Sequence, residues 1–102
     1  MNKRERILAA SRREPTDRIP YAFWRHFPGD DIRAHDLAQA TIAFQERWDS
    51  DFVKVSPSNS FGGEDWGAVT AFRGNIEGTR DYIERPIKQA SDWRKLQPLD
   101  VT

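Results

Sequence analysis

The sequence predicts an α/β fold in which two short parallel strands are joined by a helix. Two apolar segments, residues 19–24 and 52–55, have the length and composition of strands, and an amphipathic segment lies between them. The order strand, helix, strand is that of the βαβ unit of a parallel sheet or barrel. Because a strand buried on both faces needs neighbours on each side, this chain supplies too little sheet, and we expect an incomplete architecture.

Composition favours one globular unit that binds neither nucleic acid nor a membrane. The 102 residues suffice for one small domain, and four Trp with six Phe predict an aromatic core. Sixteen Lys and Arg balance sixteen Asp and Glu, so the positive surface of a nucleic-acid-binding protein is not expected. The chain has no cysteine, and its charged N-terminus is followed by only a short apolar stretch. We therefore expect a cytoplasmic protein that does not cross a membrane.

The first element is expected to be a helix over residues 3–13. Asn2 and Glu5 have the spacing of a capping box, in which each side chain accepts a hydrogen bond from the backbone N–H of the other residue. Pro15 ends the helix, because proline lacks the N–H that a helix interior needs. A short connector then leads into the first strand.

The first strand, residues 19–24, ends in two polar side chains that we predict to bind a ligand. Pro20 fits only the start of a strand. Arg25 and His26 follow at the carboxyl end, where parallel sheets and barrels bind ligands. A guanidinium group donates two parallel hydrogen bonds to a carboxylate, so we interpret Arg25 as an anion-binding residue. The alternative is a structural salt bridge to a nearby carboxylate: Asp30, Asp31 or Glu64.

A turn over residues 27–31 precedes an amphipathic helix over residues 34–48. Its apolar residues recur at spacings of three and four: Leu37, Ala40, Thr41, Phe44 and Trp48. We interpret this face as part of the core and not as a cofactor site. His35 has no second ligand at a metal-site spacing, so we predict a surface histidine and no metal site.

The second strand, residues 52–55, alternates in a way that predicts which side chains face the interior. Val53 and Val55 share one face, whereas Lys54 and Ser56 share the other, which in a barrel is the interior beside Arg25. An inward lysine is costly unless it is paired, so Lys54 either binds the substrate or is compensated by a nearby carboxylate.

The remainder of the chain is predicted to contain a functional loop, a hairpin and a short helix. The loop over residues 57–67 follows the second strand and carries three glycines, and loops in this position often bind ligands. Asn59 in this loop is our fourth predicted substrate-binding residue. Residues 68–73 and 79–83 favour a hairpin, and residues 91–96 favour a short helix capped by Ser91.

Over essentially its whole length the chain resembles the N-terminal part of the uroporphyrinogen decarboxylase family. The features that carry this resemblance are the charged N-terminal helix, residues 14–20, the strand that ends in Arg25, the strand that begins at residue 51, and residues 85–87 followed by 92–100. The resemblance implies that residues 1–102 are the N-terminal segment of a (β/α)₈ TIM barrel, which typically has about 250 residues.

The resemblance also implies a function. Members of the family are lyases of porphyrin biosynthesis that remove carboxyl groups from the acetate side chains of a porphyrinogen without a cofactor, so the implied ligand is a small carboxylate-bearing tetrapyrrole. Arg25 matches the first arginine of the family's substrate-binding motif, and the residues after it differ from that motif. The family's catalytic aspartate would fall near Pro57, where this chain has none, so we assign no catalytic residue. The complete enzyme is expected to form a homodimer.

Two alternatives remain open at the level of the sequence. Relatives with the same barrel are methyltransferases that use zinc and a corrinoid, and their metal ligands come from later in the chain. The chain could instead be a small stand-alone α/β module whose aromatic surface binds a partner protein.

Overall fold

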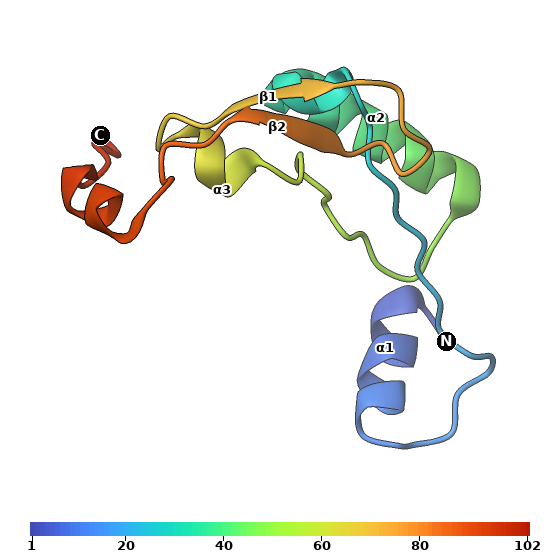
Figure 1. Ribbon diagram of the computed structural model, residues 1–102. Helices are drawn as coiled ribbons and strands as arrows, with labels where there is room; N and C mark the ends of the chain where they lie inside the picture. The colour runs from blue at the N-terminus through green and yellow to red at the C-terminus, as the bar shows by residue number, and fades with distance from the viewer.

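The computed structural model describes all residues, 1–102, and combines short helices and one hairpin with long extended segments (Figure 1). In chain order the elements are α1 (Lys3–Ser11), the 3₁₀ turn η1 (Asp30–Ile32), α2 (Ala34–Trp48), α3 (Phe61–Glu64), β1 (Val69–Phe72), β2 (Arg80–Glu84) and the 3₁₀ helix η2 (Ala90–Lys95). Figure 1 shows α1 set apart from the other elements. One extended segment leads from α1 to η1 and α2, and a second, which runs from α2 to α3, contacts α1 through Asp51.

The start of α1 is confirmed, and its end lies two residues earlier than predicted. The Glu5 N–H donates to Asn2 Oδ1 at 2.9 Å and the Asn2 N–H donates to Glu5 Oε2 at 2.9 Å, which completes the capping box. The helix ends at Ser11 because Arg13 has a left-handed backbone, with φ of 61°, which no α-helix continues.

A buried ion network connects α1 to the two extended segments. The Asp51 side chain is 0% exposed and accepts hydrogen bonds from Arg6 Nη1 at 2.5 Å and from Arg18 Nη1 at 2.6 Å. Arg6 also donates through Nε to Asp17 Oδ1 at 2.6 Å. The hydrogen bonds from Arg18 and, to a lesser extent, from the Tyr21 N–H and Arg6 hold the pKa of Asp51 well below its usual range. We call Arg6, Asp17, Arg18 and Asp51 the ion junction.

The predicted second helix is confirmed as α2, with the same bounds. Its aromatic residues contact the extended segment before it: the ring centroids of Phe44 and Phe27 lie 5.8 Å apart, and those of Trp48 and Phe23 lie 6.5 Å apart. These edge-on pairs are a common aromatic geometry. No residue of α2 is fully buried, however, so its apolar face is only partly covered.

The prediction of parallel strands, and with it the TIM-barrel fold class, is wrong. Residues 19–24 and 52–55 are extended, but neither forms a strand. The one backbone hydrogen bond near them runs from the N–H of Asp51, just before the second segment, to the Tyr21 carbonyl at 2.9 Å. The only sheet has two antiparallel strands, β1 and β2. An apolar segment becomes a strand only when a neighbour accepts its backbone hydrogen bonds, and here the two segments do not align to do so.

The predicted hairpin is confirmed, and the last helix is a 3₁₀ helix that begins one residue earlier than predicted. β1 pairs with β2 in the register Thr70–Tyr82, Ala71–Asp81 and Phe72–Arg80. The helix at residues 91–96 is instead η2, Ala90–Lys95, and Gln89 with Asp92 caps it in place of Ser91. The Lys95 ammonium and the N–H groups of Lys88 and Gln89 lower the pKa of Asp92 to about 2.

The expected aromatic core is absent, because the apolar residues that are buried are only Ala9 and Ala68. The accessible surface is 8046 Å², whereas a compact protein of 11.9 kDa exposes about 5,900 Å². The radius of gyration is 18.5 Å, whereas about 13 Å is typical of this length. The chain is therefore elongated, and most of its aromatic and aliphatic side chains are exposed.

Candidate functional site

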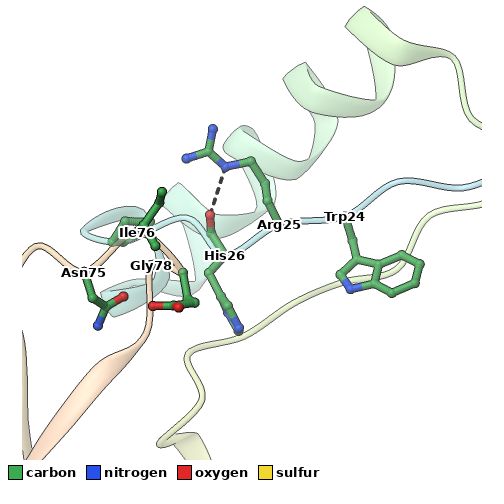
Figure 2. A pocket seen from close by; sticks show the side chains of 8 residues that line it. Trp24, Arg25, His26, Asn75, Ile76 and Gly78 are labelled. Atoms are coloured by element: carbon green, nitrogen blue, oxygen red, sulfur yellow. Dashed lines mark hydrogen bonds between the residues drawn. The ribbon is translucent and has the colours of Figure 1, made fainter.

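A cavity of about 650 Å³ opens between the segment that contains Arg25 and the turn of the hairpin (Figure 2). One wall consists of residues 24–26 and Pro28, and the other consists of residues 75–78, which connect β1 to β2. The two walls are separated by about fifty positions in the sequence and meet only in the folded chain.

The hairpin turn rests directly on the Arg25 segment through Gly78. A Cβ atom added to Gly78 would lie 3.2 Å from His26 Cβ and 3.3 Å from Pro28 Cδ, closer than most such contacts in proteins. Its φ of 71° also lies in the left-handed region, which glycine adopts without strain. Glycine is therefore the residue that lets the two walls approach, and the width of the cavity depends on it.

The turn is stiffened by the side chain of Asn75. Asn75 Nδ2 donates to the Thr79 carbonyl at 2.7 Å, and the Thr79 N–H donates to Asn75 Oδ1 at 3.0 Å. Such side-chain bonds to the local backbone hold a turn in one conformation. The residues between them, including Glu77, are thus presented to the cavity on a fixed backbone.

Arg25 has no carboxylate partner within the chain. Its Nε donates to the His26 carbonyl at 3.0 Å (Figure 2). Its Cζ lies 5.5 Å from the centroid of the Phe27 ring. The expected alternative, a salt bridge to Asp30, Asp31 or Glu64, is not formed. Asp31 and Glu64 instead face Arg80, at 3.9 Å and 3.5 Å. The two terminal nitrogens of Arg25 therefore remain free to bind an anion.

His26 contributes its ring to the same wall. The side chains of Arg25 and His26 leave the backbone in opposite directions (Figure 2). His26 is half-buried, and its Nδ1 is enclosed without a hydrogen-bond partner. The structure thus brings together two of the four residues that the sequence predicted for the site.

Lys54 lies outside the cavity. The sequence predicted that it would point into the interior of a barrel, and this chain forms no barrel. Lys54 is exposed, and its Nζ lies 4.3 Å from the centroid of the Trp24 ring, which is a cation–π contact. Trp24 itself lines the cavity. Lys54 therefore places a positive charge next to the Trp24 ring. Ser56, predicted to share its face, is buried, and its hydroxyl has no hydrogen-bond partner.

Asn59, the fourth predicted residue, forms a structural contact away from the cavity. Its Nδ2 donates to the Arg80 carbonyl at 3.2 Å, and the Arg80 N–H donates to its Oδ1 at 2.7 Å. The carboxamide thus pairs with β2 as a neighbouring strand residue would. This contact fixes the loop over residues 57–67 to the hairpin.

A polar cluster beneath the hairpin reinforces that connection. Ser60 Oγ donates to Glu64 Oε1 at 2.6 Å, the Thr70 hydroxyl donates to the same oxygen, and Arg80 Nε donates to Thr70 Oγ1 at 2.9 Å. The hydrogen bonds from Ser60 and Thr70 lower the pKa of Glu64. These side chains form hydrogen bonds with one another, so we assign them a structural role.

Sequence reasoning missed the second wall of the cavity. The glycines and Asn75 indicated a turn, but nothing in the sequence placed that turn against His26 and Pro28. Glu77, the one carboxylate that lines the cavity, was therefore not predicted as a site residue.

We also searched the chain for groups of metal-binding side chains and for helices that could span a membrane. No three His, Asp or Glu side chains lie close enough together to hold a metal ion. None of its helices has the length and apolar character needed to span a bilayer.

Comparison with known proteins identifies no relative of this chain. No family model matches the chain, and neither the curated proteins nor the solved structures contain a match.

Proposed function

We propose that this chain is the N-terminal, substrate-binding segment of an enzyme similar to the uroporphyrinogen decarboxylase family, which acts on a porphyrinogen-like carboxylate. The observation that carries this proposal is the unpaired guanidinium of Arg25 in the wall of a cavity. The order of the sequence motifs along the chain supports the choice of family.

The contacts of Arg25 suit it to a carboxylate. Because Nε is held by the His26 carbonyl, the edge that carries both terminal nitrogens is oriented in advance and can donate two parallel hydrogen bonds. The Arg25 Cζ also lies 5.5 Å from the centroid of the Phe27 ring, a cation–π contact that helps to hold the guanidinium in place. Arginine also stays charged at every working pH.

The chain would act together with further polypeptide of the same enzyme. Decarboxylation requires a site shielded from water, whereas this cavity is open and the chain buries almost no apolar side chain. The exposed aromatic residues are the surface that would pack against the remainder of the enzyme. The proposal includes a cytoplasmic enzyme that forms a homodimer when complete, and it leaves the catalytic residue unassigned.

A second candidate function is a stand-alone module whose aromatic surface binds a partner protein. The observation that favours it is the exposure of large aromatic side chains, among them Phe23, Trp24 and Trp93. The two candidates differ in how residues 1–102 behave in isolation. A module unfolds in one cooperative transition as a monomer, whereas a segment of a larger enzyme self-associates and shows no such transition.

The test of the proposed function replaces Arg25 by Lys in the complete gene product and measures the binding of uroporphyrin, the stable oxidised form of the porphyrinogen. We expect affinity to fall by about 1.5–3 kcal/mol, the range for a charge-assisted hydrogen bond. The matched control is Arg4→Lys, because Arg4 is exposed on α1, away from the cavity. Unchanged affinity of the Arg25 variant at normal thermal stability would show that Arg25 does not bind the substrate.

A further inference from the structure

Two adjoining cavities lie at the end of the hairpin opposite its turn, where α3 and η2 contribute their walls (Figure 1). One, of about 440 Å³, is lined mainly by apolar side chains, those of Trp66, Ile87, Trp93 and Leu96. The other, of about 420 Å³, is lined mainly by charged and polar side chains. Pro86 lines both cavities. We call the first the tryptophan pocket and the second the polar pocket.

The 3₁₀ helix η2 forms the wall between the two pockets. Because a 3₁₀ helix has three residues per turn, residues three positions apart lie on the same side of it. Asp92 and Lys95 line the polar pocket, whereas Trp93 and Leu96, each one position further along the chain, line the tryptophan pocket. One short helix therefore presents a polar side to one pocket and an apolar side to the other.

Tyr82 connects the two pockets from the side of the hairpin. A Cβ atom added to Gly63, which lines the tryptophan pocket, would lie 3.2 Å from the Tyr82 hydroxyl. Arg85, which lines the polar pocket, has its Cζ 5.4 Å from the centroid of the same ring, a cation–π contact. The Arg85 guanidinium therefore lies over a ring whose hydroxyl reaches the tryptophan pocket.

The polar pocket carries positive charge that the chain leaves unpaired. Its charged side chains are Glu84, Arg85, Lys88, Asp92 and Lys95, so three cations and two carboxylates leave one positive charge. Lys95 and Asp92 neutralise each other in an ion pair of 2.6 Å. Neither Arg85 nor Lys88 forms an ion pair with a carboxylate of the chain. The pocket is therefore suited to a ligand with a single negative charge.

Together the two pockets have the composition of a site for an amphipathic anion. Cavities that bind small molecules usually measure about 300–1,000 Å³ and combine apolar walls with a few polar groups that fix the orientation of the ligand. An apolar body in contact with Trp66 and Trp93 would be removed from water. A carboxylate at its end would meet Arg85 and Lys88, whereas a neutral or cationic head group would gain nothing from them.

We infer that the tryptophan pocket and the polar pocket form one binding site for a small carboxylate with an apolar body. Trp66 and Trp93 bind the apolar body, and Arg85 and Lys88 bind the carboxylate. This site goes beyond the proposed function and does not depend on it, because no residue lines both this site and the cavity of Arg25.

The experiment uses the complete gene product and three probes that share one alkyl chain: octanoate, 1-octanol and octylammonium. The probes differ in the charge of the head group, which is negative, neutral or positive. Binding is followed by NMR through the indole N–H of Trp93, whose signal is assigned with the variant Trp93→Phe; the residue is 66% exposed. Thermal unfolding of every variant is recorded to establish that it is folded.

We expect octanoate to bind about tenfold more tightly than 1-octanol, and octylammonium to bind most weakly. Arg85→Gln and Lys88→Gln should each weaken octanoate by about threefold, as is typical of an exposed ion pair, and should leave 1-octanol unchanged. Trp93→Ala, followed through the indole of Trp66, should weaken octanoate and 1-octanol alike. The matched control is Arg94→Gln, which removes an exposed cation of η2 that lines neither pocket and should leave all three affinities unchanged.

Three results would each overturn the inference. The first is that octanoate leaves the Trp93 signal of the complete protein unchanged, as it would if the remainder of the enzyme covered the pocket. The second is that 1-octanol binds as tightly as octanoate. The third is that Arg85→Gln weakens octanoate no more than Arg94→Gln does.

Arg25→Gln separates this site from the cavity of Arg25. It should weaken the binding of uroporphyrin and leave the effect of octanoate on the Trp93 signal unchanged. Loss of the octanoate effect in this variant would overturn the inference, because one site would then serve both ligands. If octanoate binds as expected and Arg25→Gln leaves uroporphyrin binding unchanged, the proposed function fails and the second site stands.

Discussion

The ion junction and the cavity both contain arginines, and they differ in whether those arginines are paired. At the junction, Arg6 and Arg18 converge on Asp51, whose side chain is fully enclosed, and the charges neutralise one another. In the cavity, Arg25 faces no carboxylate of the chain. The difference indicates that arginine is used structurally where a carboxylate reaches it and remains available for a ligand where none does.

The largest expected effect follows from breaking the junction with Asp51→Ala. Arg6 and Arg18 would then be left without their common partner, and α1 would lose its anchor. A helix of this length is marginal in water without tertiary contacts, so we expect residues 3–11 to lose their protection completely. Amide hydrogen exchange of the complete protein measures this directly.

The control for that experiment is Asp49→Ala, which removes the exposed ion pair with Lys3 and should leave the protection nearly intact. Equal loss of protection in the two variants would show that the buried network is no more important than a surface pair.

Acid should open the same junction, because the pKa values of Asp17 and Asp51 are lowered in the folded chain, chiefly by hydrogen bonds from Arg6 and from Arg18 respectively. A carboxylate whose pKa is lowered by folding stabilises the fold above its unfolded pKa, about 3.9, and loses that contribution as pH falls through the folded value. Protection of residues 3–11 should therefore persist at about pH 5 and decline only below about pH 4. A decline centred near neutral pH would instead implicate a histidine.

A smaller effect is expected from Gly78→Ala, which tests how the two walls meet. The left-handed backbone should cost about 1–2 kcal/mol of stability for any residue with a Cβ, and the new atom would also press on His26 and Pro28. Gly74→Ala is the matched control, because Gly74 has a φ of 83° but no atom within 4 Å of an added Cβ.

Both glycine variants should lower the melting temperature, but only Gly78→Ala should also weaken uroporphyrin binding, by widening the cavity. Equal effects of the two variants on binding would mean that the contact between the walls does not set the shape of the site.

The smallest effect concerns the capping box of α1. Asn2→Ala removes the acceptor for the Glu5 N–H and should destabilise α1 by about 1 kcal/mol, as is typical for a lost N-cap. Hydrogen exchange in the first turn should accelerate while the ion junction stays closed. Acceleration across the whole of α1 would indicate that the cap and the junction act as one unit.

The features that the sequence predicted correctly are those specified by neighbouring residues. The capping box of Asn2 with Glu5, the length of α2 and the hairpin each depend on local spacing. Residues 19–24 and 52–55 failed as strands because a short apolar segment shows only that the chain is extended there. Whether it joins a sheet depends on a partner elsewhere in the chain.

The residues of the site were likewise predicted only where their position depends on neighbouring residues in the sequence. Arg25 and His26 were predicted from their place at the end of an apolar segment, and both line the cavity. Asn59 was predicted from its loop, but its carboxamide pairs with Arg80. Glu77 could not be predicted, because its position opposite Arg25 arises from the contact of Gly78 with His26, which links distant parts of the chain.

The junction also bears on the order in which this chain acquires structure during synthesis. Arg6 and Asp51 are 45 positions apart in the sequence, so α1 leaves the ribosome long before its anchor exists. Until then α1 is a short helix with only its cap and its bond to Asp17 to hold it. Once Asp51 has been synthesised, its ion pair with Arg6 can close the loop between these two residues. The entropic cost of this closure grows only slowly with loop length. The first helix to be made should therefore be among the last elements to become stable.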